Sequence, residues 1–271
     1  MQKEIIACLD GSPQSETILP LAQGIASPMG AALSLLRVVT DADEWAVDEG
    51  YMRYLAGLFG ARVKSIIAQD PASAIIEELR KSPDAIAAMT THGRTAWMEA
   101  VIGSVALTVV RGAGRPVILY RPPASGVDSP STIDTIVTAL DGSAFSEKIL
   151  PITVELAQSI RAKLILVHAL ALGSENLAAR PSPTDISESS YLQSRAADIK
   201  RKYGIEPSWD TLYGEPGEAL CRFVHALPNT MLALAAHARG GLERAIFGSV
   251  SATCLRHAGV PLLLSWPVAA P

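Results

Sequence analysis

The sequence predicts an α/β protein made of two tandem copies of a Rossmann-like, five-stranded, doubly wound parallel-sheet domain. Two blocks of sequence repeat in the same order. Ile6–Pro20 and Val137–Pro151 agree at nine of fifteen positions, and Thr95–Pro122 and Gly240–Pro267 agree at eleven of twenty-eight. Around and between these blocks, short apolar runs alternate with helical patterns. Such alternation is typical of a parallel sheet covered by helices on both faces.

The first copy opens with a strand and then alternates. Ile5–Leu9 is an apolar run that ends at Asp10-Gly11-Ser12. Ser12 can cap a following helix, whose apolar residues continue at helical spacing to Ala26. Pro71–Lys81 has proline at its first position, where the missing N–H costs nothing. We expect further strands at Ala32–Val39, Val63–Ala68, Ala85–Met89 and Pro116–Tyr120, and further helices at Trp45–Phe59 and from Gly103 to Val110.

The second copy follows a linker rich in Pro, Ser and Gly, so we expect domains at 1–122 and 133–271 with the linker at 123–132. The offset between copies grows from 131 to 145 residues, which indicates an insertion of 14 residues in the second copy. We place it in Ala171–Ser190, rich in Ser, Pro and Glu, and expect a mobile excursion there. The strands predicted for this copy are Ile136–Leu140, Leu164–Leu170, Trp209–Leu212, Met231–Ala235 and Pro261–Leu264.

Composition excludes several functions. The net charge is −4, the pI is about 5.8 and no long basic run occurs, which argues against a nucleic-acid or acidic-membrane binder. No apolar stretch reaches the length of a bilayer span. Cys8, Cys221 and Cys254 lack metal-ligand spacing and are odd in number, so we expect neither a metal site nor a disulfide framework, and a buried Cys8. Because the chain begins almost directly with its first strand, we expect no signal peptide and a cytoplasmic protein.

Candidate binding residues follow the strands, because ligands of doubly wound sheets bind outside the carboxyl ends of the strands. Asp10 ends the first strand, Val38 lies near the end of the second, and Thr90 follows the fourth. Gly103-Ser104 opens the next helix and offers backbone N–H groups, a hydroxyl and the positive end of a dipole. That combination suits a phosphate, although Ser104 is equally explained as an ordinary helix cap.

These residues resemble the universal stress protein family in its tandem-domain form. The resemblance covers nearly the whole chain and rests on Asp-Gly-Ser after the first strand, MTTHGR at 89–94, IGSVA at 102–106 and RPVILY at 115–120. Nucleotide-binding members of that family carry the motif G-x2-G-x9-G-[ST] after the fourth strand. In the first copy, Thr90 takes the first glycine position, and Gly93, Gly103 and Ser104 follow at the family spacing.

The resemblance implies that the first copy binds ATP or a related adenine nucleotide, with a nucleotide-borne Mg²⁺ left open. It implies that Asp10 contacts the ribose or the metal-phosphate region, that the Val38 backbone recognises adenine, and that Thr90 lies near the ribose. The phosphates are then surrounded by Gly93, Gly103 and Ser104. Arg94 either reaches a phosphate or is a solvated loop residue.

The second copy departs further from the motif. It keeps Asp141, Gly248 and Ser249 at the matching positions but has Ala235 and Ala238 at the first two glycine positions. An alanine is strained wherever the backbone needs a positive φ. We therefore interpret the second copy as a weaker or degenerate site, with nucleotide binding in both copies as the alternative.

Three functions stay open at this point. The first is a regulatory stress-response module that binds nucleotide mainly in the first copy, and the second is a nucleotide-independent dimerisation or interaction scaffold, which the missing glycines favour. The third is a slow ATPase using Asp10, His92 or Arg94, but no catalytic triad or P-loop is present, so we expect binding rather than catalysis. The repeated domains also predict an internal pseudo-dimer, formed in this family through the final strands, and leave a homodimer open.

Overall fold

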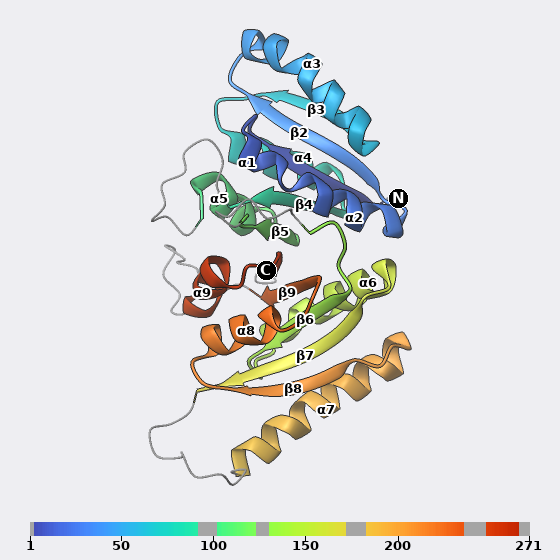
Figure 1. The fold of residues 1–271 in the computed structure, drawn as a ribbon, viewed down its shortest axis with the longest axis vertical. Coiled ribbons are helices and arrows are strands. Elements are labelled where there is room, and N and C mark those ends of the chain that lie inside the picture. Colours follow the sequence, from blue (N-terminus) through green and yellow to red (C-terminus); the bar gives the residue numbers. More distant parts are fainter. Residues whose placement is uncertain (1–2, 92–101, 123–129, 172–182, 236–247, 266–271) are drawn as a thin grey trace. The chain divides into compact units, whose positions relative to one another are not determined.

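The computed structural model describes residues 3–91, 102–122, 130–171, 183–235 and 248–265 (Figure 1). Its contacts divide the chain into one unit of Met1–Thr132 with Leu264–Pro271 and a second unit of Ile133–Leu263. Below, copy one means residues 1–122 and copy two means residues 133–271.

The described strands of copy one form a parallel sheet centred on β1 (Glu4–Leu9). β1 pairs with β2 (Ala32–Val39) on one side and β4 (Ala85–Thr90) on the other. β3 (Arg62–Ile67) lies outside β2 and β5 (Val117–Tyr120) outside β4, giving the order β3-β2-β1-β4-β5. The chain moves outward in one direction from β1 and then in the other, so the sheet reverses its strand order between β1 and β4. This reversal is where doubly wound sheets bind ligands.

The helices of copy one confirm the predicted alternation with one correction. We predicted a continuous helix after Ser12, but the structure has two pieces separated at Thr17 and Ile18. Pro20 explains the break, because a proline cannot donate to the carbonyl four residues earlier and its ring collides with it. Ser12 does cap the first piece, accepting the Ser15 N–H at 3.2 Å. The helices are α1 (Pro13–Glu16), α2 (Leu19–Met29), α3 (Ala42–Phe59), α4 (Pro71–Lys81) and α5 (Ser104–Gly112).

Copy two repeats the topology, with strand order β8-β7-β6-β9-β10. Its strands are β6 (Thr135–Leu140), β7 (Lys163–Leu170), β8 (Ser208–Tyr213), β9 (Thr230–Ala235) and β10 (Leu262–Ser265). Its helical segments are η1 (Ser146–Ile149), α6 (Leu150–Ile160), α7 (Pro183–Tyr203), α8 (Pro216–His225) and α9 (Ser249–His257).

Two further expectations need correction. We predicted a mobile excursion over Ala171–Ser190, but residues 183–190 form the first turns of α7. A proline such as Pro183 is tolerated in the first turn of a helix, so the Ser/Pro-rich composition did not exclude one. We also predicted strands buried on both faces, which holds for β1 but not for β3 and β8, where Ile67 is 59% exposed and Trp209 is 39% exposed.

Candidate functional site

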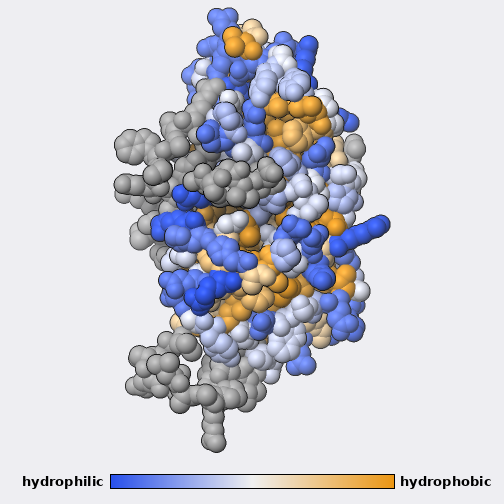
Figure 2. Space-filling view, viewed as in Figure 1, coloured by the Kyte–Doolittle hydropathy of each residue, from blue (hydrophilic) through white to orange (hydrophobic). Residues whose placement is uncertain are grey.

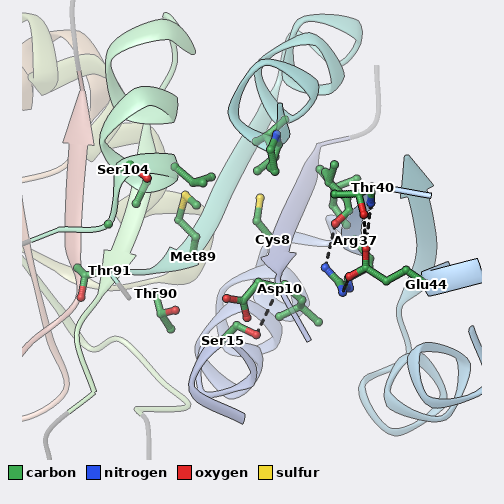
Figure 3. Close-up of a pocket in the computed structure, with 18 residues that line it drawn as sticks. Cys8, Asp10, Ser15, Arg37, Thr40, Glu44, Met89, Thr90, Thr91 and Ser104 are labelled. Carbon is green, nitrogen blue, oxygen red and sulfur yellow. Dashed lines mark hydrogen bonds and ion pairs between the residues drawn. The ribbon is translucent and has the colours of Figure 1, made fainter. Parts of the chain in front are cut away.

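A cavity of about 300 Å³ lies at the carboxyl ends of β1, β2 and β4 in copy one. Five of the predicted residues line it: Asp10, Val38, Thr90, Gly103 and Ser104. In Figure 3, Cys8, Asp10 and Met89 lie between Thr90 and Thr91 on one side and Arg37, Thr40 and Glu44 on the other. The cavity therefore combines apolar walls with polar groups from the ends of three strands and from three helices, α1, α3 and α5.

Asp10 is held in a tight turn at the end of β1. Its Oδ1 accepts hydrogen bonds from the Ser12 N–H at 3.0 Å and the Ser12 hydroxyl at 2.6 Å. The Asp10 N–H donates to the Ser15 hydroxyl at 3.3 Å. Gly11 has φ of +79°, a conformation that glycine adopts without strain. The Asp-Gly-Ser sequence thus fixes the carboxylate at the edge of the cavity.

The start of α5 forms another part of the wall. Gly103 is the N-cap of this helix and has no side chain that could cap it. The first N–H groups of a helix have no partner within it. Together with the exposed Ser104, they give the cavity hydrogen-bond donors and the positive end of a helix dipole.

Gly103 also has a purely structural role. Its N–H donates to the Thr91 carbonyl at 2.6 Å, and a Cβ added to Gly103 would lie 3.0 Å from that same carbonyl oxygen. Its φ of −65° is available to any residue, so close packing rather than backbone conformation favours glycine here. The third glycine of the motif is therefore explained without a ligand.

Arg37 is one of the polar residues of this cavity that sequence reasoning missed. It is 3% exposed, and its Nη2 lies 2.8 Å from Glu44 and 2.7 Å from Asp48 on α3. Its Nη1 donates to the Val38 carbonyl at 2.8 Å. The Thr40 backbone N–H and the Arg37 guanidinium hold the pKa of Glu44 below its usual range. A signal was available, because an arginine within the apolar run ALSLLRVV needs buried partners, and two acidic residues follow it.

Copy two has a cavity at the matching place, of about 520 Å³, lined by Asp141, Gly248 and Ser249 among others. The turn at Asp141 repeats the one at Asp10: the carboxylate accepts from the Ser143 N–H at 3.0 Å, and the Asp141 N–H donates to the Ser146 hydroxyl at 3.2 Å. His168 takes in copy two the position that Arg37 takes in copy one. Arg37 pairs with Leu9 at the end of β1, and His168 pairs with Leu140 at the end of β6. The Thr90 position is Ala235, so copy two lacks that hydroxyl.

Some predicted residues lie outside the described part of the chain. These are His92, Gly93 and Arg94 in copy one, and Ala238, which takes the position of Gly93 in copy two. Among described residues, no group of three or more His, Cys, Asp or Glu side chains could hold a metal ion. No helix among them is long and apolar enough to cross a membrane. Cys8 is buried as expected, and burial raises the pKa of its thiol to about 12.

Comparison with known proteins agrees with this arrangement of the sheet. Residues 132–265 match the model of the universal stress protein family. This chain therefore carries a universal stress protein domain in copy two. Universal stress proteins of Mycobacterium tuberculosis and Mycobacterium bovis are 27% identical to it over 182 residues, which cover 65% of this chain. The match spans 59% of the length of those relatives.

Solved structures share the fold across both copies. A universal stress protein from Archaeoglobus fulgidus superposes with a TM-score of 0.75 at 20% identity, covering 98% of each chain. The cytoplasmic domain of a prokaryotic cation chloride cotransporter reaches a TM-score of 0.57 at 12% identity, covering 97% of this chain and 95% of its own. Because proteins with such different roles share this architecture, function has to be argued from the site.

Proposed function

We propose that this universal stress protein binds an adenine nucleotide, ATP with or without Mg²⁺, mainly in the cavity of copy one, and acts as a regulatory module. The observation that carries the proposal is the convergence of Asp10, Val38, Thr90, Gly103 and Ser104 on one cavity at the switch point of the sheet. These residues are separated by up to 94 positions in the sequence and meet only through the fold.

The residues present suit the parts of a nucleotide. The start of α5 supplies backbone donors for a phosphate, together with the Ser104 hydroxyl. Asp10, fixed by Ser12, is an acceptor for a ribose hydroxyl or for water bound to a nucleotide-borne Mg²⁺. The apolar side chains of Leu36 and Met89 line the same cavity and suit a purine ring.

Arg37 limits how adenine is recognised. The family resemblance assigns the Val38 backbone to adenine, and the carbonyl of that backbone already accepts a hydrogen bond from Arg37. A carbonyl oxygen has two lone pairs, so an adenine amino group would share this acceptor with the guanidinium. We infer that adenine is held here less tightly than it would be beside an unshared carbonyl.

The alternative is a scaffold that needs no nucleotide. Two observations favour it: the Arg37 bond to Val38, and the packing of Gly103 against Thr91, which explains a motif glycine without a ligand. The two functions differ in one measurable respect, because only the first requires heat of binding when ATP is added.

The test is calorimetric titration of ATP into wild-type protein and two matched variants, Ser104→Ala in copy one and Ser249→Ala in copy two. Loss of one hydrogen bond to a charged group is worth about 1.5–3 kcal/mol, so we expect Ser104→Ala to weaken binding roughly tenfold or more. Ser249→Ala should leave the main binding event unchanged. Equal effects of both variants would contradict the assignment to copy one, and no heat in any protein would favour the scaffold.

A further inference from the structure

The outer face of α3 carries an exposed apolar stripe. Its residues are Val47, Tyr51, Tyr54 and Leu58, which are 83%, 50%, 60% and 59% exposed. Their spacing of four, three and four residues places them along one side of the helix. Tyr51 and Tyr54 stack with ring centroids 6.2 Å apart. Apolar residues also reach the surface at the end of the space-filling view where Figure 1 labels α3 (Figure 2).

Two glycines lie beside the stripe at positions where no contact within the described chain requires glycine. Gly50 and Gly57 are exposed, seven residues apart in the interior of α3, and a Cβ on either would meet nothing within 4 Å. A glycine in a helix interior costs about 1 kcal/mol relative to alanine. Because neither position has a side chain, another backbone can approach the helix closely beside the stripe.

Copy two supplies an internal comparison for this face. Gln23 donates to the Phe59 carbonyl at the end of α3, and Gln158 donates to the Tyr203 carbonyl at the end of α7. Tyr51 donates to Glu16, and Arg195 donates to the matching Glu147. The glutamine bonds to Phe59 and Tyr203 set the helices in register at an offset of 144 residues. Glu147 also accepts from Tyr191 at 2.9 Å, one turn before Arg195.

In that register, copy two has charged residues at three of the four stripe positions. Val47, Tyr51, Tyr54 and Leu58 correspond to Tyr191, Arg195, Asp198 and Lys202, and the two glycines correspond to Ser194 and Arg201. Asp198 forms ion pairs with Arg195 at 2.8 Å and with Arg201. The fold therefore does not require an apolar face at this place, and of the described parts of α3 and α7 only α3 has one.

We propose that α3 is an interface through which two copies of this chain associate, with the two helices antiparallel about a two-fold axis. The stripe is symmetric about the midpoint between Met52 and Arg53. A two-fold axis there sets Val47 of one molecule opposite Leu58 of the other, and Tyr51 opposite Tyr54. Such self-complementarity is what a two-fold interface requires.

Charge favours the same orientation. Acidic residues gather in the first half of α3, including the exposed Asp43. The antiparallel arrangement keeps the acidic first turns of the two helices apart, whereas a parallel one would set them together. A single helix of 18 residues is about 27 Å long and buries less than the roughly 800 Å² per partner of a standard interface, so the dimer is weak and depends on concentration.

Sedimentation velocity over a range of protein concentrations tests this interface. We expect a dimer fraction that rises with concentration for the wild type and is lost in Val47→Glu and Leu58→Glu, which alter exposed side chains. Lys202→Glu changes the position in copy two that matches Leu58, and we expect it to dimerise as the wild type does. A wild type that stays monomeric throughout, or a dimer that survives Leu58→Glu, would overturn the proposal.

Cross-linking tests the orientation, using single variants Val47→Cys and Leu58→Cys. Antiparallel helices bring these two positions together, whereas identical positions lie about 16 Å apart across the axis, too far for a disulfide. A mixture of the two variants should form a covalent dimer under oxidation, and each variant alone should not. Cys8, Cys221 and Cys254 are buried, so the wild-type chain gives the background level of cross-linking. Equal cross-linking of a single variant would overturn the antiparallel arrangement.

Discussion

The guanidinium of Arg37 donates a hydrogen bond of 2.8 Å to the carbonyl oxygen of Val38, the next residue in the chain. The same guanidinium is fixed by Glu44 and Asp48, so the contact is held by the packing of α3 on β2. A structural ion pair therefore borders the part of the cavity where adenine would be recognised. This arrangement links the stability of copy one to its proposed binding site.

Replacing Arg37 with methionine should destabilise the protein by about 2–3 kcal/mol, because Glu44 and Asp48 would lose a buried partner. Urea unfolding measures the change. Arg53→Met is the control, because the side chain of Arg53 is 72% exposed and its pair with Glu49 is worth less than about 1 kcal/mol. Similar losses in the two variants would contradict a structural role for the buried pair.

Glycine-to-alanine changes should have opposite effects at two places in copy one. Gly103→Ala should cost about 1–2 kcal/mol, because its Cβ would crowd the Thr91 carbonyl. Gly50→Ala should add about 0.5–1 kcal/mol, because its Cβ enters open space in a helix interior. Thermal unfolding of dilute protein measures both. A neutral Gly103→Ala would show that the contact relaxes without cost.

Acid should weaken copy one through a cluster that joins β1, β3 and α4. Lys64 lies 2.9 Å from Glu4 and 3.0 Å from Glu78. Burial raises the pKa of both carboxyls, but hydrogen bonds, from Ser34 and Lys64 to Glu4 and from Lys81 and Lys64 to Glu78, outweigh it and hold each pKa below the usual 4.5. The stabilisation is present above pH 4.5 and is lost as the pH falls through the folded values.

The variant Glu4→Gln tests this dependence. Its free energy of unfolding should be lower than that of the wild type at neutral pH, and the gap should narrow as the pH falls below about 4. Urea unfolding at several pH values measures it. A constant gap at every pH would mean that Glu4 stabilises the fold by packing rather than by charge.

Much of the fold could be predicted because strand and helix patterns were strong and appeared twice. The bounds of β2 and α4 agree with the prediction. The break at Thr17 was missed because apolar periodicity continues through it, although Pro20 marked the place. The helix at residues 183–190 was missed because composition alone does not exclude a helix that starts at a proline.

The site was predictable where residues follow strands and not where they face one another. Asp10, Val38, Thr90, Gly103 and Ser104 could be placed because a doubly wound sheet gathers the ends of its strands. The contact between Arg37 and the Val38 carbonyl depends on how α3 packs, which no motif records. The close contact between Gly103 and the Thr91 carbonyl likewise depends on packing and could not be predicted from the sequence.

The most direct test of nucleotide binding is to denature the purified protein, separate what it releases by chromatography, and titrate ATP into the stripped protein. We expect one adenine nucleotide per chain and a binding heat that is diminished in Ser104→Ala. No released nucleotide and no heat at millimolar ATP would contradict it and would favour a scaffold that needs no ligand.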